Sequence, residues 1–277
     1  MFGLIFATII SEEKEGNLIY KRDLINEAYI CQIYINEKEI TNNYKLQKVN
    51  NIVYIFQKKY NYLSNMFKSC SLLTTINLEN IDTNEVVTME GLFENCSSLV
   101  SVVLPVNKTK KLANMRNMFK DCIALTSVDF SKFNTDEVIK MANMFENCRS
   151  ITSIDLSSFN TLKVNDMSNM FKNCTALLSI NVSKFNTTNV NDMRGMFENC
   201  SSITTIDLSS FHTNNTTKME RMFQNCSSLK LVDLSNIADI NIKKIKDMFS
   251  LCKSLNPDGI IIKDYKVKDK LLLKLKI

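Results

Sequence analysis

Nine cysteines are the side chains of this sequence with the clearest capacity for redox or metal chemistry. Eight of them recur at a constant step of 26 residues, and Cys31 lies outside the series. The eight are Cys70, Cys96, Cys122, Cys148, Cys174, Cys200, Cys226 and Cys252. Because no two of them form a C-x-x-C pair, a zinc site has no local framework, and we expect no metal. The spacing instead predicts a column of buried free thiols that pack as small apolar side chains.

Disulfide bonds between successive members of this column are not expected from the sequence. If each cysteine ends a short helix, equivalent Cα atoms of neighbouring units lie about 8–10 Å apart. A disulfide needs Cα atoms within about 7 Å of each other. Free thiols suit a reducing compartment, although burial would also protect them outside the cell. The sequence therefore favours the cytoplasm, with the cell surface or secretion as the alternative.

A second column with the same period carries carboxylates and amides. Its members are Asp129, Asp155, Asn181, Asp207 and Asp233, and serines that include Ser157, Ser183 and Ser209 follow two residues later. On adjacent parallel strands these side chains would lie about 4.8 Å apart. Like charges at that distance raise one another's pKa values, or attract a cation or a basic partner. We take these eight residues as the candidate partner-binding strip. The alternative is a solvated face whose carboxylates bond to neighbouring hydroxyls.

Residues suited to catalysis are scarce. The chain has 1 His and 5 Gly, so histidine-based catalysis and glycine-rich phosphate loops have little to work with. His212 replaces an asparagine of earlier units, which indicates a loop variant, and no Ser or Cys has an evident His partner for a triad. We therefore expect a chain that is not an enzyme and that uses no cofactor.

The elements that position these columns follow from the 26-residue unit. A Phe stands three residues before every column cysteine. In one unit the spacing i, i+3, i+4, i+7 is filled by Met167, Met170, Phe171 and Cys174. This spacing predicts a short helix of about two turns with one buried face. Asn165 or Asp166 would cap its N-terminus, and Asp192 would do so one unit later.

The segment after each cysteine alternates in a way that predicts a strand. Ile154 and Leu156 are separated by polar residues, and this period of two gives one buried face. Phe159 then turns inward before the next unit begins. A unit of strand, turn and short helix cannot bury both of its flanks alone, so the units must stack.

The sequence thus predicts an α/β solenoid of about eight 26-residue repeats, with a parallel sheet on one face and short helices on the other. We expect a β-rich cap over residues 1–62, the solenoid over 63–255, and a C-terminal cap with a basic tail over 256–277. Met1–Ile10 is almost wholly apolar and is either a signal remnant or a buried first strand.

Charge limits the classes of partner. The net charge is +5, and most of it lies in the tail from Lys263 to Ile277, so the rest of the chain is close to neutral. A nucleic-acid-binding face of clustered Lys and Arg is not visible. An anionic membrane could be contacted only through the basic tail, for which a capping strand or helix is the alternative.

The motif L-x-x-I-D-L-S-x-F-N-T, followed by V-x-D-M-x-x-M-F-x-N-C, resembles the BspA-like leucine-rich-repeat surface proteins. The resemblance covers about Leu63 to Leu255. It implies a right-handed leucine-rich-repeat-type solenoid and a role in adhesion or protein binding, often at a cell surface. It carries over no catalytic residues. The sequence therefore favours a non-catalytic protein-interaction or scaffold module that binds through its strand face, with a cell-surface adhesin or antigen as the alternative. It identifies neither the protein partner nor the oligomeric state.

Overall fold

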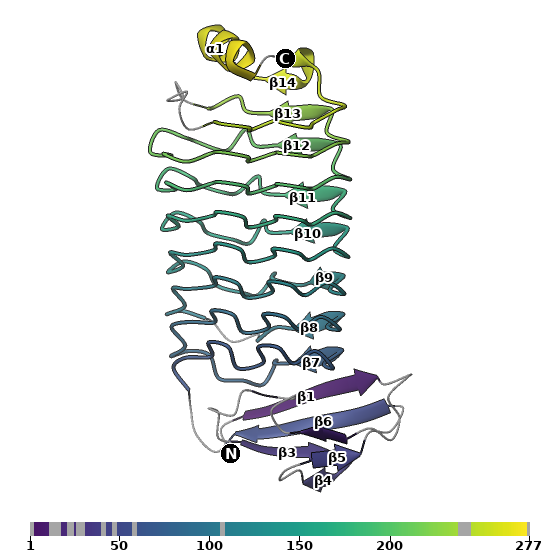
Figure 1. Cartoon of the computed structure of the whole chain (residues 1–277). Helices are drawn as coiled ribbons and strands as arrows, with labels where there is room; N and C mark the ends of the chain where they lie inside the picture. Colours follow the sequence, from purple (N-terminus) through teal and green to yellow (C-terminus); the bar gives the residue numbers. More distant parts are fainter. Residues whose placement is uncertain are drawn as a thin grey trace.

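A computed structural model describes residues 3–10, 18–20, 25, 31–39, 43–45, 49–56, 60–105, 109–237 and 245–275. Coils of similar outline are stacked between an N-terminal sheet and a C-terminal helix (Figure 1). The N-terminal strands pair antiparallel, whereas the coils contribute parallel strands. The N-terminal strands are β1 (Gly3–Ile10), β2 (Leu18–Tyr20), β3 (Cys31–Ile35), β4 (Lys38–Glu39), β5 (Asn43–Lys45) and β6 (Val49–Phe56).

Each coil contributes one short parallel strand to the same side of the solenoid, which we call the strand wall. The strands are β7 (Thr75–Asn77), β8 (Ser101–Val103), β9 (Ser127–Val128), β10 (Ser153–Asp155), β11 (Ser179–Asn181), β12 (Thr205–Asp207) and β13 (Leu231–Asp233). Equivalent residues pair directly, as Ile154 does with Ile180. The predicted solenoid and its parallel strands are therefore confirmed.

The predicted short helices are wrong. The segments that end at the column cysteines form consecutive turns, and within the described residues the only α-helix is α1 (Tyr265–Leu275). In one coil, alternate backbone N–H groups donate to carbonyls of the next coil at 2.7–2.9 Å, from Met167, Asn169, Phe171 and Asn173 to Asp192, Arg194, Met196 and Glu198. The N–H groups of Met170 and Lys172, which lie between these, donate to carbonyls three residues earlier in the same coil, those of Met167 and Asn169, at 3.3 and 3.1 Å. We call this side the turn wall.

Left-handed residues explain why the turn wall does not become a helix. Each coil has two of them, four residues apart, such as Asn169 with φ 54° and Asn173 with φ 62°. Asn and Gly tolerate this conformation better than other residues do. Gly195 fills the first position one coil later with φ 58°, and a Cβ there would lie 2.5 Å from Oδ1 of Asn169. The expected N-cap Asp166 instead closes a single turn, because its Oδ1 accepts the N–H of Ser168 at 3.0 Å.

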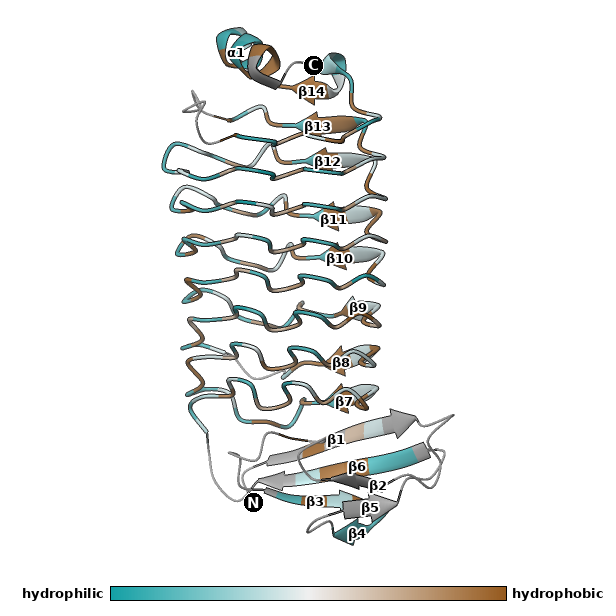
Figure 2. Cartoon of the chain, viewed as in Figure 1, coloured by the Kyte–Doolittle hydropathy of each residue, from teal (hydrophilic) through white to brown (hydrophobic). Residues whose placement is uncertain are grey.

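Stacked phenylalanines form the core behind the turn wall. Phe171 is 1% exposed and lies between Phe145 and Phe197, with ring centroids 5.6 and 5.4 Å away. A second stack, which includes Phe185 and Phe211 at 6.2 Å, lies behind the end of the strand wall. Apolar and polar stretches alternate along every coil, as expected when one side of the chain faces this core (Figure 2).

The column cysteines are all free, and seven of the eight are buried. Each thiol from Cys96 onward donates to a phenylalanine carbonyl of the preceding coil, as Cys174 does to Phe145 at 3.2 Å. Burial raises the pKa of Cys174 to about 12, so this thiol stays protonated at neutral pH. The predicted buried thiols are confirmed. The expected 8–10 Å separation is wrong, because coils that pair through their backbones lie as close as strands, about 5 Å apart.

Polar side chains of the turn wall form a ladder of amides. Nδ2 of each asparagine donates to the side-chain oxygen of the equivalent residue one coil earlier, at 2.5–2.9 Å. The ladder runs through Asp121, Asn147, Asn173, Asn199 and Asn225. Its spacing follows from the backbone pairing, and each bond joins two neighbouring coils.

A column of charged residues lies next to this ladder and alternates in sign from coil to coil. Its members are Lys68, Glu94, Lys120, Glu146, Lys172 and Glu198. They form three ion pairs, with N–O distances of 3.1, 3.0 and 2.9 Å. Each of these pairs joins one coil to the next, so the coils are linked two by two.

Both ends of the solenoid are covered. β1 pairs antiparallel with β7, which places Ala7 opposite Ile76, and Ile5 and Ala7 are buried. Residues 3–10 of the apolar N-terminal segment are thus a strand, while Met1 and Phe2 lie outside the described residues. At the other end β14 (Ile260–Ile261) pairs with β13, and α1 buries Val267 and Leu271. Among the described helices, none is long and apolar enough to span a bilayer.

Candidate functional site

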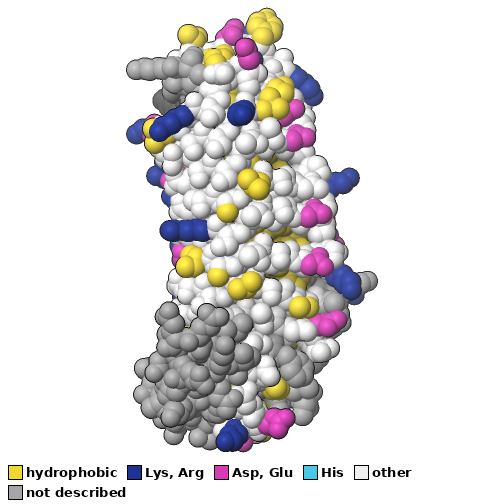
Figure 3. Space-filling model, turned by 90° about the vertical axis from the view of Figure 1, so that its right-hand side faces the viewer, with side chains coloured by type: hydrophobic (Ala, Val, Ile, Leu, Met, Phe, Trp, Pro, Cys, Tyr) yellow, Lys and Arg dark blue, Asp and Glu magenta, His cyan; other side chains and the backbone are white. Residues whose placement is uncertain are grey.

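The outer face of the strand wall is the candidate binding surface. In β10, Ile154 points inward and is 7% exposed, whereas Ser153 and Asp155 are exposed. The same alternation in the other strands gives a face of mainly short side chains. Viewed from this side, acidic groups gather along one margin and uncharged groups fill the middle (Figure 3).

The predicted strip residues are brought together on this face. Asp155 pairs in register with Asn181, and Asp207 with Asp233. Each member of the column accepts the backbone N–H two residues further on. The acceptors are Asp129, Asp155, Asn181, Asp207 and Asp233, and the donors are Ser131, Ser157, Ser183, Ser209 and Ser235, at 2.8–3.2 Å. These Asx turns end each strand and redirect the chain.

The expectation that these carboxylates raise one another's pKa values is wrong. The backbone N–H and the hydroxyl of Ser157 hold the pKa of Asp155 below its ordinary value. The same two groups of Ser131 lower the pKa of Asp129, and for Asp207 the hydroxyl of Ser209 is the larger cause. Hydrogen bonds to the charged form outweigh the repulsion across solvent. Asp129, Asp155 and Asp207 are therefore ionised at neutral pH and bond to neighbouring hydroxyls.

Apolar side chains interrupt this polar face at a few places that the candidate strip did not include. Val103, Leu178 and Leu231 are 47%, 58% and 39% exposed, and Val100 is 41% exposed. They occupy columns in which most other coils carry Thr, Ser or Asp. The signal was present in the sequence as a departure from the repeat, since a large aliphatic residue at an outward position has no core to enter.

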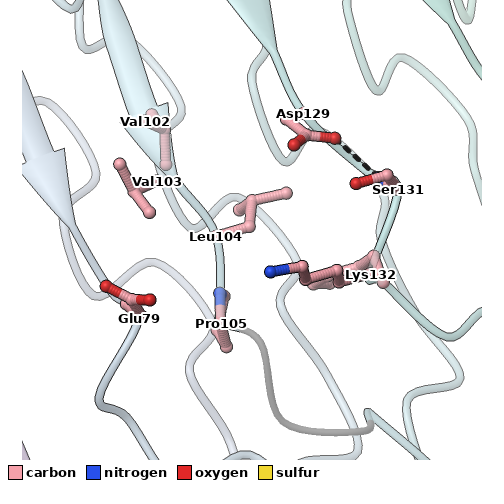
Figure 4. A pocket seen from close by; sticks show the side chains of 9 residues that line it. Glu79, Val102, Val103, Leu104, Pro105, Asp129, Ser131 and Lys132 are labelled. Atoms are coloured by element: carbon pink, nitrogen blue, oxygen red, sulfur yellow. Dashed lines mark hydrogen bonds between the residues drawn. The ribbon is translucent and has the colours of Figure 1, made fainter.

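A hollow of about 220 Å³ lies beside β8, where the strip is interrupted. Val103 and Pro105 stand there in place of the Asp and Ser of the strip. Lys132 extends over the apolar floor toward Leu104 and Pro105, with Glu79 opposite (Figure 4). Pockets for drug-sized ligands usually measure about 300–1,000 Å³. The hollow is therefore better described as a dent in the wall than as a small-molecule site.

Charge pairing differs between this face and the rest of the molecule. Among the described residues, no Lys or Arg forms an ion pair with the strip carboxylates, and the ion pairs lie in other columns, such as Lys163 with Glu137 at 2.6 Å. The part of the chain that the structure describes also contains no cluster of three His, Cys, Asp or Glu residues that could hold a metal ion.

Comparison with known proteins identifies a family to which this chain is similar. A family model described as "Mycoplasma protein of unknown function, DUF285" matches residues 61–177 and 151–265. No curated protein matches the sequence. The two matches overlap and together span the solenoid and β14, up to the first residue of α1, which is well over half of the chain. The chain belongs to the DUF285 family.

Proposed function

We propose that this chain is a non-catalytic protein-interaction module that binds a protein partner through the outer face of the strand wall. One observation carries the proposal: exposed aliphatic side chains lie among the ionised and hydroxyl groups of this face. Leu178 is 58% exposed between polar neighbours, and Val103 and Leu231 repeat the arrangement on other coils. Protein interfaces combine such apolar anchors with a polar rim.

The rigidity of the solenoid supports this proposal. The backbone bonds of the turn wall join successive coils, and the Asx turns fix where each strand ends. A surface that is already ordered loses little conformational entropy on binding. The eight residues of the strip, from Asp129 to Asp233, would supply hydrogen-bond partners around the aliphatic anchors.

Site-specific photo-cross-linking in the cells that produce the protein tests the proposal. A photoreactive amino acid replaces Leu178, which directly precedes β11, and a matched variant carries it at Leu162, which is 48% exposed and lies beyond Phe159, away from the ends of β10 and β11. We expect a discrete cross-linked species from position 178 that position 162 does not give. Leu231→Ser in the first variant should weaken that species. The same species from both positions, or none from position 178, would refute the proposal.

The second candidate is a cell-surface adhesin or antigen, favoured by the resemblance to BspA-like surface proteins. It uses the same face and differs in location. Labelling of intact cells with a membrane-impermeant amine reagent separates the two, because the chain exposes lysines such as Lys163 and Lys111. Labelled protein supports the adhesin, and protein that is labelled only after lysis supports the interior scaffold. A turnover activity that is lost on changing one residue would contradict both candidates.

A further inference from the structure

The thiol column is uniform except at its last member. Seven of the eight cysteines are buried, and Cys252 is partly exposed. Because only this end of the column reaches the surface, reagents that attack thiols meet Cys252 before any other member.

The coils that carry Cys226 and Cys252 are also more closely spaced at the phenylalanine stack than other neighbouring coils. Each of the two thiols donates to a phenylalanine carbonyl of the preceding coil, Cys226 to Phe197 at 3.0 Å and Cys252 to Phe223 at 2.9 Å. The rings of Phe223 and Phe249, three residues before these cysteines, lie 5.1 Å apart, against 5.4–5.7 Å elsewhere in that stack. A disulfide needs Cα atoms about 4.4–6.8 Å apart, which the spacing of paired coils satisfies.

The turn that carries Cys252 is less firmly held than its equivalents. The amide ladder reaches Asn225, and the next position is Leu251, which has no amide to continue it. Leu251 is left-handed with φ 65° and is 58% exposed. Left-handed backbone is unfavourable for a leucine, so this turn combines a strained residue with a missing ladder bond.

The pKa values of the two thiols also favour Cys252 as the nucleophile. Interaction with the neighbouring thiol lowers the pKa of Cys252 and raises that of Cys226. Burial raises the pKa of interior members, to about 12 for Cys96 and Cys174. The thiolate is the reactive form, so the interior thiols are protected both by burial and by protonation.

We propose that Cys226 and Cys252 are a peroxide-reactive dithiol that closes to a disulfide and covalently joins the last two coils. The Cys252 thiolate attacks one oxygen of a hydroperoxide, the O–O bond breaks, and the departing oxygen takes a proton. The resulting sulfenic acid is attacked by the Cys226 sulfur, the S–S bond forms, and the S–O bond breaks with release of water. Two thiols are oxidised, and hydrogen peroxide is reduced to two molecules of water.

Peptide mapping of the full-length protein after treatment with hydrogen peroxide tests this proposal. Trypsin cuts after Arg221, Lys230, Lys246 and Lys253, so the two cysteines lie on separate peptides. We expect these two peptides to be joined by a disulfide, while the interior cysteines are alkylated only after unfolding. A Cys31→Ser background removes the one cysteine outside the column.

Two variants and an interior control make the result decisive. Cys252→Ser should abolish peroxide consumption by the folded protein, and Cys226→Ser should leave a sulfenic acid on Cys252 that dimedone traps. Cys148→Ser, in the middle of the column, should leave the cross-link unchanged. Oxidation of Cys252 to the sulfinic acid in the wild-type chain without a cross-link would overturn the proposal, as would equal oxidation of Cys148 and Cys252.

Discussion

The turn wall and the strand wall of each coil hold the array together to different extents. On the turn wall every second N–H between Met167 and Asn173 crosses to the next coil, and the amide ladder and ion pairs add side-chain bonds. The parallel strands are two or three residues long, and the sheet is interrupted between β9 and β10 and between β11 and β12. The turn wall therefore carries most of the cohesion, and the strand wall leaves its outer face available for binding.

Removing a core ring should have the largest effect on stability. Phe171→Ala should lower the free energy of unfolding by about 3–5 kcal/mol through the cavity it leaves in the stack. Ile154→Val on the inner face of the strand wall should cost only about 1 kcal/mol. Chemical denaturation measures both changes, and hydrogen exchange should rise between residues 145 and 197 for the first. Similar losses for the two variants would contradict the assigned difference between the walls.

An intermediate effect is expected from the amide ladder. Asn173→Ala loses the bonds to Asn147 and Asn199 and places an alanine at φ 62°, so it should cost about 2–3 kcal/mol. Asn173→Gly loses the same bonds and keeps the backbone relaxed, so it should cost about 1 kcal/mol less than alanine. Thermal unfolding of both variants separates the two contributions. A glycine variant that is less stable than the alanine variant would show that the left-handed conformation is not the constraint.

The smallest effect on stability is expected on the strand wall, and it should depend on pH. The folded-state pKa of Asp207 is lowered, so its stabilisation is complete above the unfolded pKa of about 3.9 and is lost as pH falls through the folded pKa. Asp207→Ala should therefore melt slightly below the wild type at pH 7, and the difference should shrink as the pH falls below about 3.9. Ser153→Ala serves as a control without a titrating group. A difference that grows as pH falls would contradict the assigned sign.

The solenoid is predictable from the sequence because three patterns recur with the 26-residue period: the cysteines, the alternation seen at Ile154 and Leu156, and the phenylalanines. Each of them arises because equivalent residues of successive coils stack on one another. The sequence misleads on the turn wall, because a chain of turns with two left-handed residues four apart buries the same i, i+3, i+4, i+7 positions as a helix. Asn169 and Asn173 were the missed signal, since asparagine is a weak helix former that tolerates left-handed backbone.

The candidate strip was only partly predictable. The column itself follows from the repeat. The pKa of Asp155, however, depends on a hydrogen bond from the backbone N–H two residues later, and the repeat spacing alone does not predict that bond. The exposed Leu178 and the hollow beside Val103 arise where single coils depart from the consensus, so averaging over repeats conceals them.

The alternating charges next to the amide ladder restrict how such an array can change its length during evolution. Duplicating or deleting a single coil between Lys68 and Glu198 would bring two lysines or two glutamates into contact. Duplicating two adjacent coils preserves the alternation of the three ion pairs. Within this stretch, related chains should therefore differ in length by even numbers of coils.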